Sequence, residues 1–249
     1  MVILKAPWEI ARMRVSNRIV AGALEALSQA VKPGITTLEL DRIAEDFLRQ
    51  EGALPAFKGY KDYPFALCAS VNEEVVHGMP SDRALVEGDI VSLDMGAIVG
   101  GYYGDGAVTV PVGVVSPAAE RLLRVTREAL ERGVGAAQRG ARLGDISHAV
   151  QAHVERLGYS VVRTFVGHGI GRQLHEEPQI PNFGPPGRGP VLLTGMVLAI
   201  EPMVNAGGAQ VEILPDRWTA VTADRSLSAH FEHTVAITED GPEVLTRAD

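Results

Sequence analysis

Two stretches of the sequence, Val31–Gly52 and Ala137–Gly158, match each other at an offset of 106 residues. Glycines coincide near both ends of the match, and apolar residues stay in phase between them, as Leu48 does with Val154. This pattern indicates a duplicated helical unit, although two unrelated amphipathic helices would also resemble each other. A duplication restricts the chain to a fold with two similar halves, and pockets preferentially form at such a junction.

The spacing of apolar residues predicts four helices and several strands. The predicted helices are Pro7–Val31, Thr36–Gly52, one that begins at Ser116-Pro117, and Asp145–Leu157. The predicted strands are Phe65–Val71, Asp89–Val99 and Tyr102–Val112, followed by Met196–Glu201, Gln210–Leu214 and Phe231–Thr238. We therefore expect an α+β fold, with one catalytic domain over residues 1–249 and internal halves of about 1–113 and 114–249. The proline-rich segment Pro178–Pro190 is expected to be a stiff surface loop and not a domain linker.

Composition sets the class of protein. The chain has 249 residues, of which 46% are apolar and 22% charged, as in globular proteins. Its longest run without a charge is 14 residues, whereas a membrane-spanning helix needs roughly 20. The net charge of −8 argues against a nucleic-acid site, which is usually basic.

Two further features predict a location. The single cysteine, Cys68, can form no internal disulfide. Only four residues precede Lys5, so the chain does not begin with the apolar stretch of a secretory signal. We expect a cytoplasmic protein without membrane contact.

Two aspartates share one face of a predicted hairpin. A turn at Val99-Gly100 would place Asp94 directly opposite Asp105, and a turn one residue later would pair Asp105 with Gly96. The two carboxylates point the same way in either register, between apolar neighbours. Facing like charges are destabilising, and a multivalent cation between them would remove the repulsion. The alternative is a pair of solvated aspartates on an exposed hairpin.

Other acidic and imidazole groups stand in similarly apolar sequence. Glu201 ends the run Gly195–Ile200, and alternation along a strand would place Glu232 on one face and His233 on the other. Glycines flank His168, which allows its backbone to approach another segment closely. From this pattern alone, His168 and His175 could be metal ligands or ordinary loop histidines.

Several motifs together resemble those of the methionine aminopeptidases, in the short bacterial-type form of the pita-bread fold. They are SVNEEVVHGMP at Ser70–Pro80, Asp94 with Asp105, GHGIG at Gly167–Gly171 with HEEP at His175–Pro178, EPM at Glu201–Met203 and EHT at Glu232–Thr234. The resemblance covers nearly the whole chain. It implies two pseudo-symmetric halves that form a curved, mostly antiparallel sheet covered by helices.

The resemblance also implies a ligand set and roles for its members. Two adjacent divalent ions (Co, Mn, Fe or Zn) would be held by Asp94, Asp105, His168, Glu201 and Glu232. Four carboxylates and one imidazole suit such borderline cations. Glu201 would also help to move a proton, and His77 and His175 would contact the substrate without being ligands. The methionine pocket would be built from Tyr60, Tyr63, Cys68, His77 and Trp218.

The implied activity is removal of the initiator methionine from nascent polypeptides, near the ribosome, by a monomer that prefers a small second residue. The sequence departs from the family pattern at Gly96, Ala199 and Leu174, which leaves rate and metal choice open. Two alternatives remain: an X-Pro peptidase of the same fold, and a non-catalytic binding protein that has kept the fold. The proline-specific relatives usually carry a large additional N-terminal domain.

Overall fold

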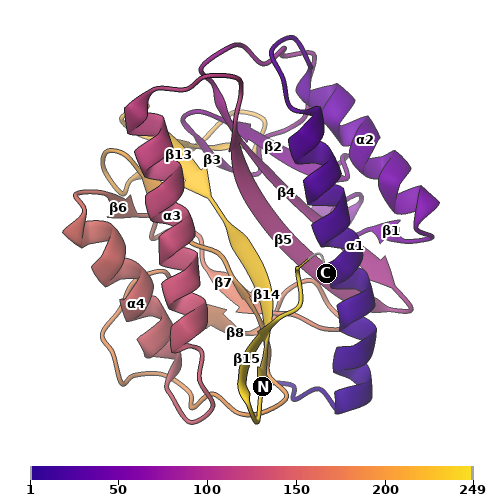
Figure 1. The fold of residues 1–249 in the computed structure, drawn as a ribbon, viewed down its shortest axis with the longest axis vertical. Coiled ribbons are helices and arrows are strands. Elements are labelled where there is room, and N and C mark those ends of the chain that lie inside the picture. Colours follow the sequence, from indigo (N-terminus) through magenta and orange to yellow (C-terminus); the bar gives the residue numbers. More distant parts are fainter. Residues whose placement is uncertain (1, 248–249) are drawn as a thin grey trace.

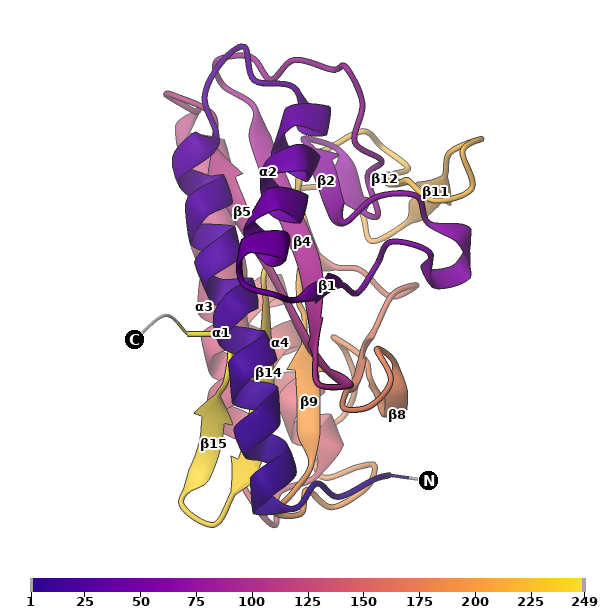
Figure 2. The ribbon, with the colours of Figure 1, turned by 90° about the vertical axis from the view of Figure 1, so that its right-hand side faces the viewer.

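Helices cover one side of a large curved sheet in the computed structural model, which describes residues 2–247 (Figures 1 and 2). The helices are α1 (Pro7–Ala30), α2 (Thr37–Gln50), α3 (Pro117–Ala136) and α4 (Leu143–Arg156), with a 3-10 turn at Tyr60–Asp62. Short strands and loops lie on the other side of the sheet (Figure 2). Within residues 2–247, no helix combines the length and the apolar character needed to cross a membrane.

Local capping explains where these helices begin. The Thr36 hydroxyl accepts a hydrogen bond from the Glu39 N–H (3.1 Å), and the Glu39 carboxylate accepts one from the Thr36 N–H (2.8 Å). The fourth helix starts at Leu143, two residues before the predicted start, because Asp145 caps it from within the first turn. Its carboxylate accepts a hydrogen bond from the Arg142 N–H at 2.7 Å.

The two helices of the sequence repeat are equivalent in the structure. Helices α2 and α4 each have 14 residues, and their first residues lie 106 positions apart, as do their last. The glycines before them, Gly34 and Gly140, have φ values of 94° and 85°, a conformation that favours glycine. The match at this offset therefore extends from the sequence to the backbone.

The large sheet has nine strands and is continuous through both halves of the chain. The strand order is β1-β4-β5-β14-β9-β7-β8, with β2 paired to β4, β15 paired to β14, and every pairing antiparallel. Its strands are β1 (Leu54–Pro55), β2 (Leu67–Val71), β4 (Ile90–Val99), β5 (Tyr102–Pro111), β7 (Gly167–Gly169), β8 (Glu176–Ile180), β9 (Val197–Ile200), β14 (Glu232–Thr238) and β15 (Gly241–Val244). The predicted α+β class with a curved antiparallel sheet is confirmed.

Two small sheets flank the large one. The first contains β6 (Ser160–Val161), β10 (Met203–Asn205) and β13 (Ser228–His230), and the second β3 (Glu74–Val76), β11 (Val211–Ile213) and β12 (Ala220–Thr222). The predicted loop Pro178–Pro190 is partly wrong, because its first three residues complete β8. The rest of the segment contains no helix or strand.

The hairpin between β4 and β5 turns at Gly100-Gly101, so the register that places Asp94 opposite Asp105 is wrong. Asp105 pairs with Gly96, and Asp94 pairs with Ala107. Both turn glycines have positive φ, 57° and 80°, as a two-residue hairpin turn of the I′ type requires. A turn at Val99-Gly100 would force a β-branched residue into that conformation.

At Gly104 on β5, the backbone of helix α1 packs directly against the sheet. A Cβ added to Gly104 on β5 would lie 2.8 Å from the backbone of Ser16 and Asn17 on α1. The Asn17 side chain accepts a hydrogen bond from the N–H of Asp105 (3.3 Å). This contact connects the helical layer to a strand that carries a predicted site residue.

Candidate active site

The five side chains predicted as metal ligands come from or directly follow five neighbouring strands of the large sheet. Asp94 lies on β4, Asp105 on β5 and His168 on β7, while Glu232 begins β14 and Glu201 directly follows β9. Neighbouring strands are only ~5 Å apart, so side chains on one face at the same level converge. All five line one cavity.

The distances within this group differ from one pair to the next. Asp105, His168 and Glu232 place one ligand atom each within 4.8 Å of one another. His168 Nε2 lies 3.5 Å from Glu201 Oε1 and 3.7 Å from Asp105 Oδ2. Asp94 is not part of that group of three and faces the same cavity from the neighbouring strand.

The buried carboxylates lack partners that would offset their charge. Within the described residues, Asp94 Oδ1, Asp105 Oδ1 and Glu232 Oε1 accept no hydrogen bond. Burial raises the pKa of Asp94 to about 7, and burial with mutual repulsion raises the pKa values of Asp105 and Glu232 well above the usual range. The pKa of Glu201 is also raised well above its usual range, mainly by burial and next by repulsion from Asp94. Buried charges normally require paired charges or metal ions, so this donor set fits divalent cations.

His168 has its lone pair turned toward the carboxylates. Its Nδ1 donates to the carbonyl of Gly169 at 2.9 Å, which leaves Nε2 unprotonated when the ring is neutral. Burial lowers the pKa of His168 to about 3, so the ring is neutral near pH 7. A Cβ on Gly167 would lie 2.4 Å from the carbonyl oxygen of Ala199, which explains why glycine precedes the histidine.

The cavity has a volume of about 170 Å³, and all eleven predicted site residues line it. Three more side chains line it as well, Phe57, Lys61 and Leu174. Leu174 is one of the departures from the family pattern, whereas Phe57 and Lys61 were not predicted from the sequence. Their position in the same short segment as Tyr60 and Tyr63 is the signal that could have found them.

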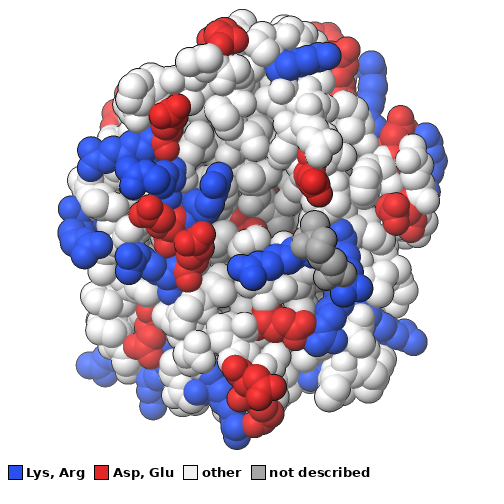
Figure 3. Space-filling model, viewed as in Figure 1, with Lys and Arg blue, Asp and Glu red and all other residues white. Residues whose placement is uncertain are grey.

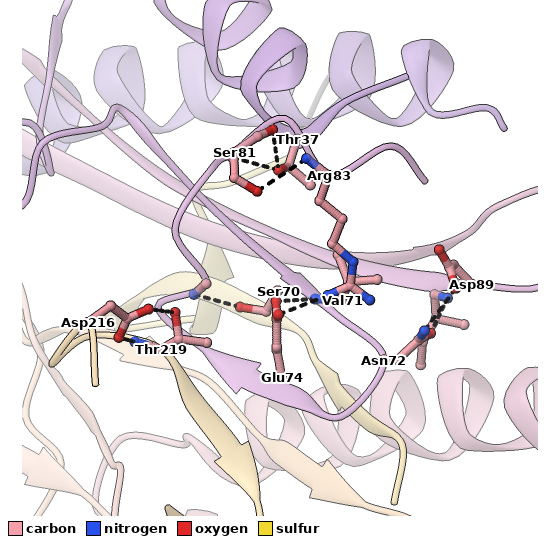
Figure 4. A network of polar contacts seen from close by, with 12 residues as sticks. Thr37, Ser70, Val71, Asn72, Glu74, Ser81, Arg83, Asp89, Asp216 and Thr219 are labelled. Atoms are coloured by element: carbon pink, nitrogen blue, oxygen red, sulfur yellow. Dashed lines mark hydrogen bonds and ion pairs between the residues drawn. The ribbon is translucent and has the colours of Figure 1, made fainter. Parts of the chain in front are cut away.

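Polar contacts of Ser70 and Asp216, which Figure 4 shows, hold the backbone next to two cavity-lining residues, His77 and Trp218. His77 has a positive φ of 60° directly after β3, and the next N–H, that of Gly78, donates to Ser70 Oγ at 3.0 Å. Burial lowers the pKa of His77 to about 4. The imidazole meets the Trp218 ring edge-on at 6.2 Å, and Asp216 accepts hydrogen bonds from the backbone N–H of Trp218 and of Thr219 at 2.9 Å.

A contact with Tyr60 orients His175, which also lines the cavity. Tyr60 Oη lies 2.9 Å from His175 Nδ1, with the two rings stacked at 5.3 Å. The His175 ring lies 4.2 Å from that of His168, measured between centroids. Burial lowers the pKa of His175, so this ring too is neutral near pH 7.

Aromatic and sulfur groups also line the cavity. Tyr63 donates its hydroxyl to the carbonyl of Leu67 at 3.0 Å and packs against Trp218 at 4.9 Å. Cys68 lies on β2 directly opposite Asp94, and burial raises the pKa of its thiol. The thiol is therefore protonated near pH 7, as suits a pocket wall and not a nucleophile.

The helical face carries no extended patch of one charge. Figure 3 shows Lys and Arg side chains interspersed with Asp and Glu over the region of α3 and α4. Among the described residues on this face, the basic groups therefore do not form a continuous surface of the kind that meets phosphates.

Comparison with known proteins identifies relatives over nearly the whole chain. A model of metallopeptidase family M24 matches residues 11–239. Methionine aminopeptidase 1 of Bacillus subtilis is 55% identical over 99% of this chain and 100% of that protein. The crystal structure of methionine aminopeptidase from Thermotoga maritima superimposes with a TM-score of 0.98 at 50% identity, covering 99% of this chain and 100% of that one.

A more distant relative shares the fold but is longer. Prolidase from Pyrococcus furiosus superimposes with a TM-score of 0.79 at 25% identity, covering 99% of this chain but only 66% of the prolidase chain. The predicted pita-bread architecture is confirmed by these structures.

Proposed function

The chain belongs to metallopeptidase family M24, and we propose that it removes methionine from the N-termini of nascent polypeptides. One observation carries this proposal: five donor side chains from adjacent strands converge beside a cavity lined by aromatic and sulfur groups. The cavity of about 170 Å³ suits a single side chain better than a longer stretch of peptide.

Two divalent cations, Co, Mn, Fe or Zn, would fit among Asp94, Asp105, His168, Glu201 and Glu232. The unpartnered carboxylate oxygens and the unprotonated Nε2 of His168 support this assignment. Four carboxylates would offset the charge of two such ions. When bound, the ions would activate a water molecule at neutral pH and polarise the carbonyl of the first peptide bond.

The protein's own groups would move the proton and hold the developing charge. The Glu201 side chain is 13% exposed, and burial followed by repulsion from Asp94 raises its pKa, which suits a group that takes up a proton. If Tyr60 donates to His175 Nδ1, the proton of His175 stays on Nε2, which can donate to an oxyanion. His77 lies next to Trp218, where it can contact the substrate from the side of the methionine pocket.

The pocket walls match a thioether side chain. Tyr60, Tyr63, Cys68 and Trp218, together with His77, offer polarizable surfaces to sulfur. Because this pocket lies directly beside the metal-binding groups, little space is left for the second residue of a substrate.

We expect fast hydrolysis of peptides that begin Met-Gly, Met-Ala or Met-Ser, and slow hydrolysis of those that begin Met-Lys or Met-Phe. The measurement is kcat/KM for each peptide of this series in the presence of Mn²⁺, with the release of free methionine as the readout. Equal rates across the series would contradict the proposed pocket.

The X-Pro peptidase alternative predicts a different substrate. Mass spectrometry of Met-Ala-Ser and Ala-Pro peptides incubated with Mn²⁺ or Co²⁺ separates the two activities. We expect loss of methionine from the first peptide and no cleavage of the second. Cleavage of the X-Pro bond alone would favour a prolidase-like activity, and cleavage of neither would favour a non-catalytic binding protein.

A further inference from the structure

His230, the last residue of β13, is a buried imidazole without an evident partner. Its side chain is 1% exposed, and neither ring nitrogen makes a hydrogen bond within residues 2–247. Buried polar atoms are normally hydrogen-bonded, because water can no longer satisfy them. An unpaired imidazole close to the proposed metal site therefore requires a physical explanation.

The backbone of His230 is held rigidly against the strands of the site. Its N–H donates to Thr109 Oγ1 at 2.8 Å, and its carbonyl accepts from the same hydroxyl at 2.7 Å. Because the Thr109 proton is used in this way, the Ser92 hydroxyl donates to Thr109 Oγ1, at 2.8 Å. Ser92 and Thr109 lie on β4 and β5, the strands that carry Asp94 and Asp105.

Glu201 is the charged group that His230 faces. His230 Nε2 lies 3.8 Å from Glu201 Oε2, whereas the other oxygen, Oε1, lies 3.5 Å from His168 Nε2. The carboxylate thus lies between two imidazoles, with one oxygen toward each. A shift of roughly half an ångström would bring His230 Nε2 and Glu201 Oε2 within hydrogen-bond distance.

We propose that His230 is a positioning residue that donates its Nε2–H to Glu201 Oε2 and so keeps Glu201 Oε1 directed toward the side of His168. A neutral imidazole has a single N–H, and with one oxygen engaged the carboxylate can no longer rotate freely about its last bond. Groups behind a metal ligand commonly set its orientation and basicity in this way. His230 does not line the cavity, so it acts through Glu201 and does not touch the substrate.

This inference rests on the proposed metal site, and three substitutions test it. His230→Gln places an amide nitrogen where the ring has Nε2, and His230→Asn places one where the ring has Nδ1. His230→Phe keeps the volume of the ring without a donor. His153→Phe is the matched control, because His153 is a buried histidine on α4 that lines no part of the active-site cavity.

Three properties of each variant are measured: Mn²⁺ affinity by calorimetry, the visible absorption spectrum of the Co²⁺-loaded protein, and kcat and KM for Met-Ala-Ser. We expect His230→Phe and His230→Asn to weaken Mn²⁺ binding and lower kcat by ~10-fold to 100-fold, with KM nearly unchanged. Their Co²⁺ bands should shift. His230→Gln should restore all three properties, and His153→Phe should alter none of them.

Several outcomes would overturn the inference. If His230→Phe and His230→Asn keep the metal affinity, Co²⁺ spectrum and kcat of the unsubstituted protein, His230 only fills space. Equal losses in His230→Gln and His230→Asn would exclude a specific role for Nε2. If His230→Phe does not fold, the comparison of His230→Gln with His230→Asn alone decides whether the donor at Nε2 matters. Failure of the unsubstituted protein to bind Mn²⁺ or to release methionine would instead contradict the proposed function.

Discussion

The histidines of the cavity differ in what surrounds their ring nitrogens. The unprotonated Nε2 of His168 faces Asp105 and Glu201. His175 Nδ1 contacts the Tyr60 hydroxyl, and the His77 ring packs edge-on against Trp218. The first arrangement suits the proposed role of a metal ligand. The other two suit the proposed contacts with the substrate.

Substitution of each histidine by alanine should separate these roles. Mn²⁺ at a hundredfold excess over Kd should stabilise the protein by ~2.7 kcal/mol per site. We expect His168→Ala to lose much of this gain, because a ligand is removed. His77→Ala and His175→Ala should keep it while turnover falls by ~10²-fold, because a group that acts on the substrate is lost.

Melting curves with Mn²⁺ and with EDTA, together with peptide hydrolysis, check this for all three variants. A metal-dependent shift that survives in His168→Ala but disappears in His77→Ala would contradict the assignment. The unsubstituted protein measured in parallel is the control.

Single residues could be assigned from the sequence where a motif surrounded them, and not otherwise. His168 and Glu201 stood out by their glycine and proline neighbours. No spacing indicated the contact of His230 with Glu201, because that contact depends on the pairing of β13 with β10, in which Met203 lies opposite His230. Such a contact between residues 29 positions apart depends on the register of a sheet and cannot be read from spacing.

At the scale of elements, the contact between α1 and β5 should be sensitive to a single methyl group. Gly104→Ala would place a Cβ 2.8 Å from the backbone of Ser16 and Asn17, so the helix must move away from the strand. We expect a loss of ~1–3 kcal/mol in the free energy of unfolding. Turnover should fall as well, because Asp105 follows Gly104 directly and donates its N–H to Asn17.

Gly135→Ala is the matched control for this substitution. Gly135 lies within α3, and no atom lies within 4 Å of a Cβ built there. We expect it to raise stability by ~0.5–1 kcal/mol, because alanine favours a helix more than glycine does. Urea unfolding of both variants measures the difference. A Gly104→Ala protein as stable as Gly135→Ala would show that the helix and strand do not pack as described.

Elements were easier to predict than their register. Helix ends depend on local signals such as the capping box of Thr36 and Glu39, and these were found in the sequence. Both candidate turns of the β4–β5 hairpin contained Gly100, so spacing alone could not decide between them. The requirement for two positive φ values favours Gly100-Gly101, because two glycines adopt this conformation without strain and a valine does not.

For the whole molecule, the two halves are joined by the site itself. Asp94 and Asp105 come from residues 1–113, whereas His168, Glu201 and Glu232 come from residues 114–249. The strands β5 and β14 pair across the boundary, where Glu232 lies opposite Ala107. Because four carboxylates meet there, the stability of the whole fold should depend on pH and on metal.

The pH dependence has a defined sign. A carboxyl group whose pKa is raised in the folded state contributes stability at low pH, and this contribution is lost as pH rises through the folded pKa. For Asp94 that value is about 7, and the pKa values of Asp105, Glu201 and Glu232 are raised further by burial and repulsion. The buried histidines, including His168, have lowered pKa values and act in the opposite direction. The contribution of the histidines to the pH dependence ends above pH ~6.5, the pKa of histidine in the unfolded chain.

We therefore expect the metal-free protein to lose stability between about pH 6.5 and pH 8, by up to ~1.4 kcal/mol per pH unit for each carboxyl group that is still protonated in the folded protein but ionised in the unfolded chain. The Mn²⁺-loaded protein should not, because the cations compensate the carboxylates that ionise in this range. The melting temperature in Mn²⁺ should thus exceed that in EDTA by a margin that grows with pH. Asp94→Asn should flatten the dependence in EDTA below about pH 7, because the Asp94 carboxyl contributes to the slope only while it is protonated in the folded protein. A margin that stayed constant or shrank toward pH 8 would show that the four carboxylates do not share a metal-dependent site.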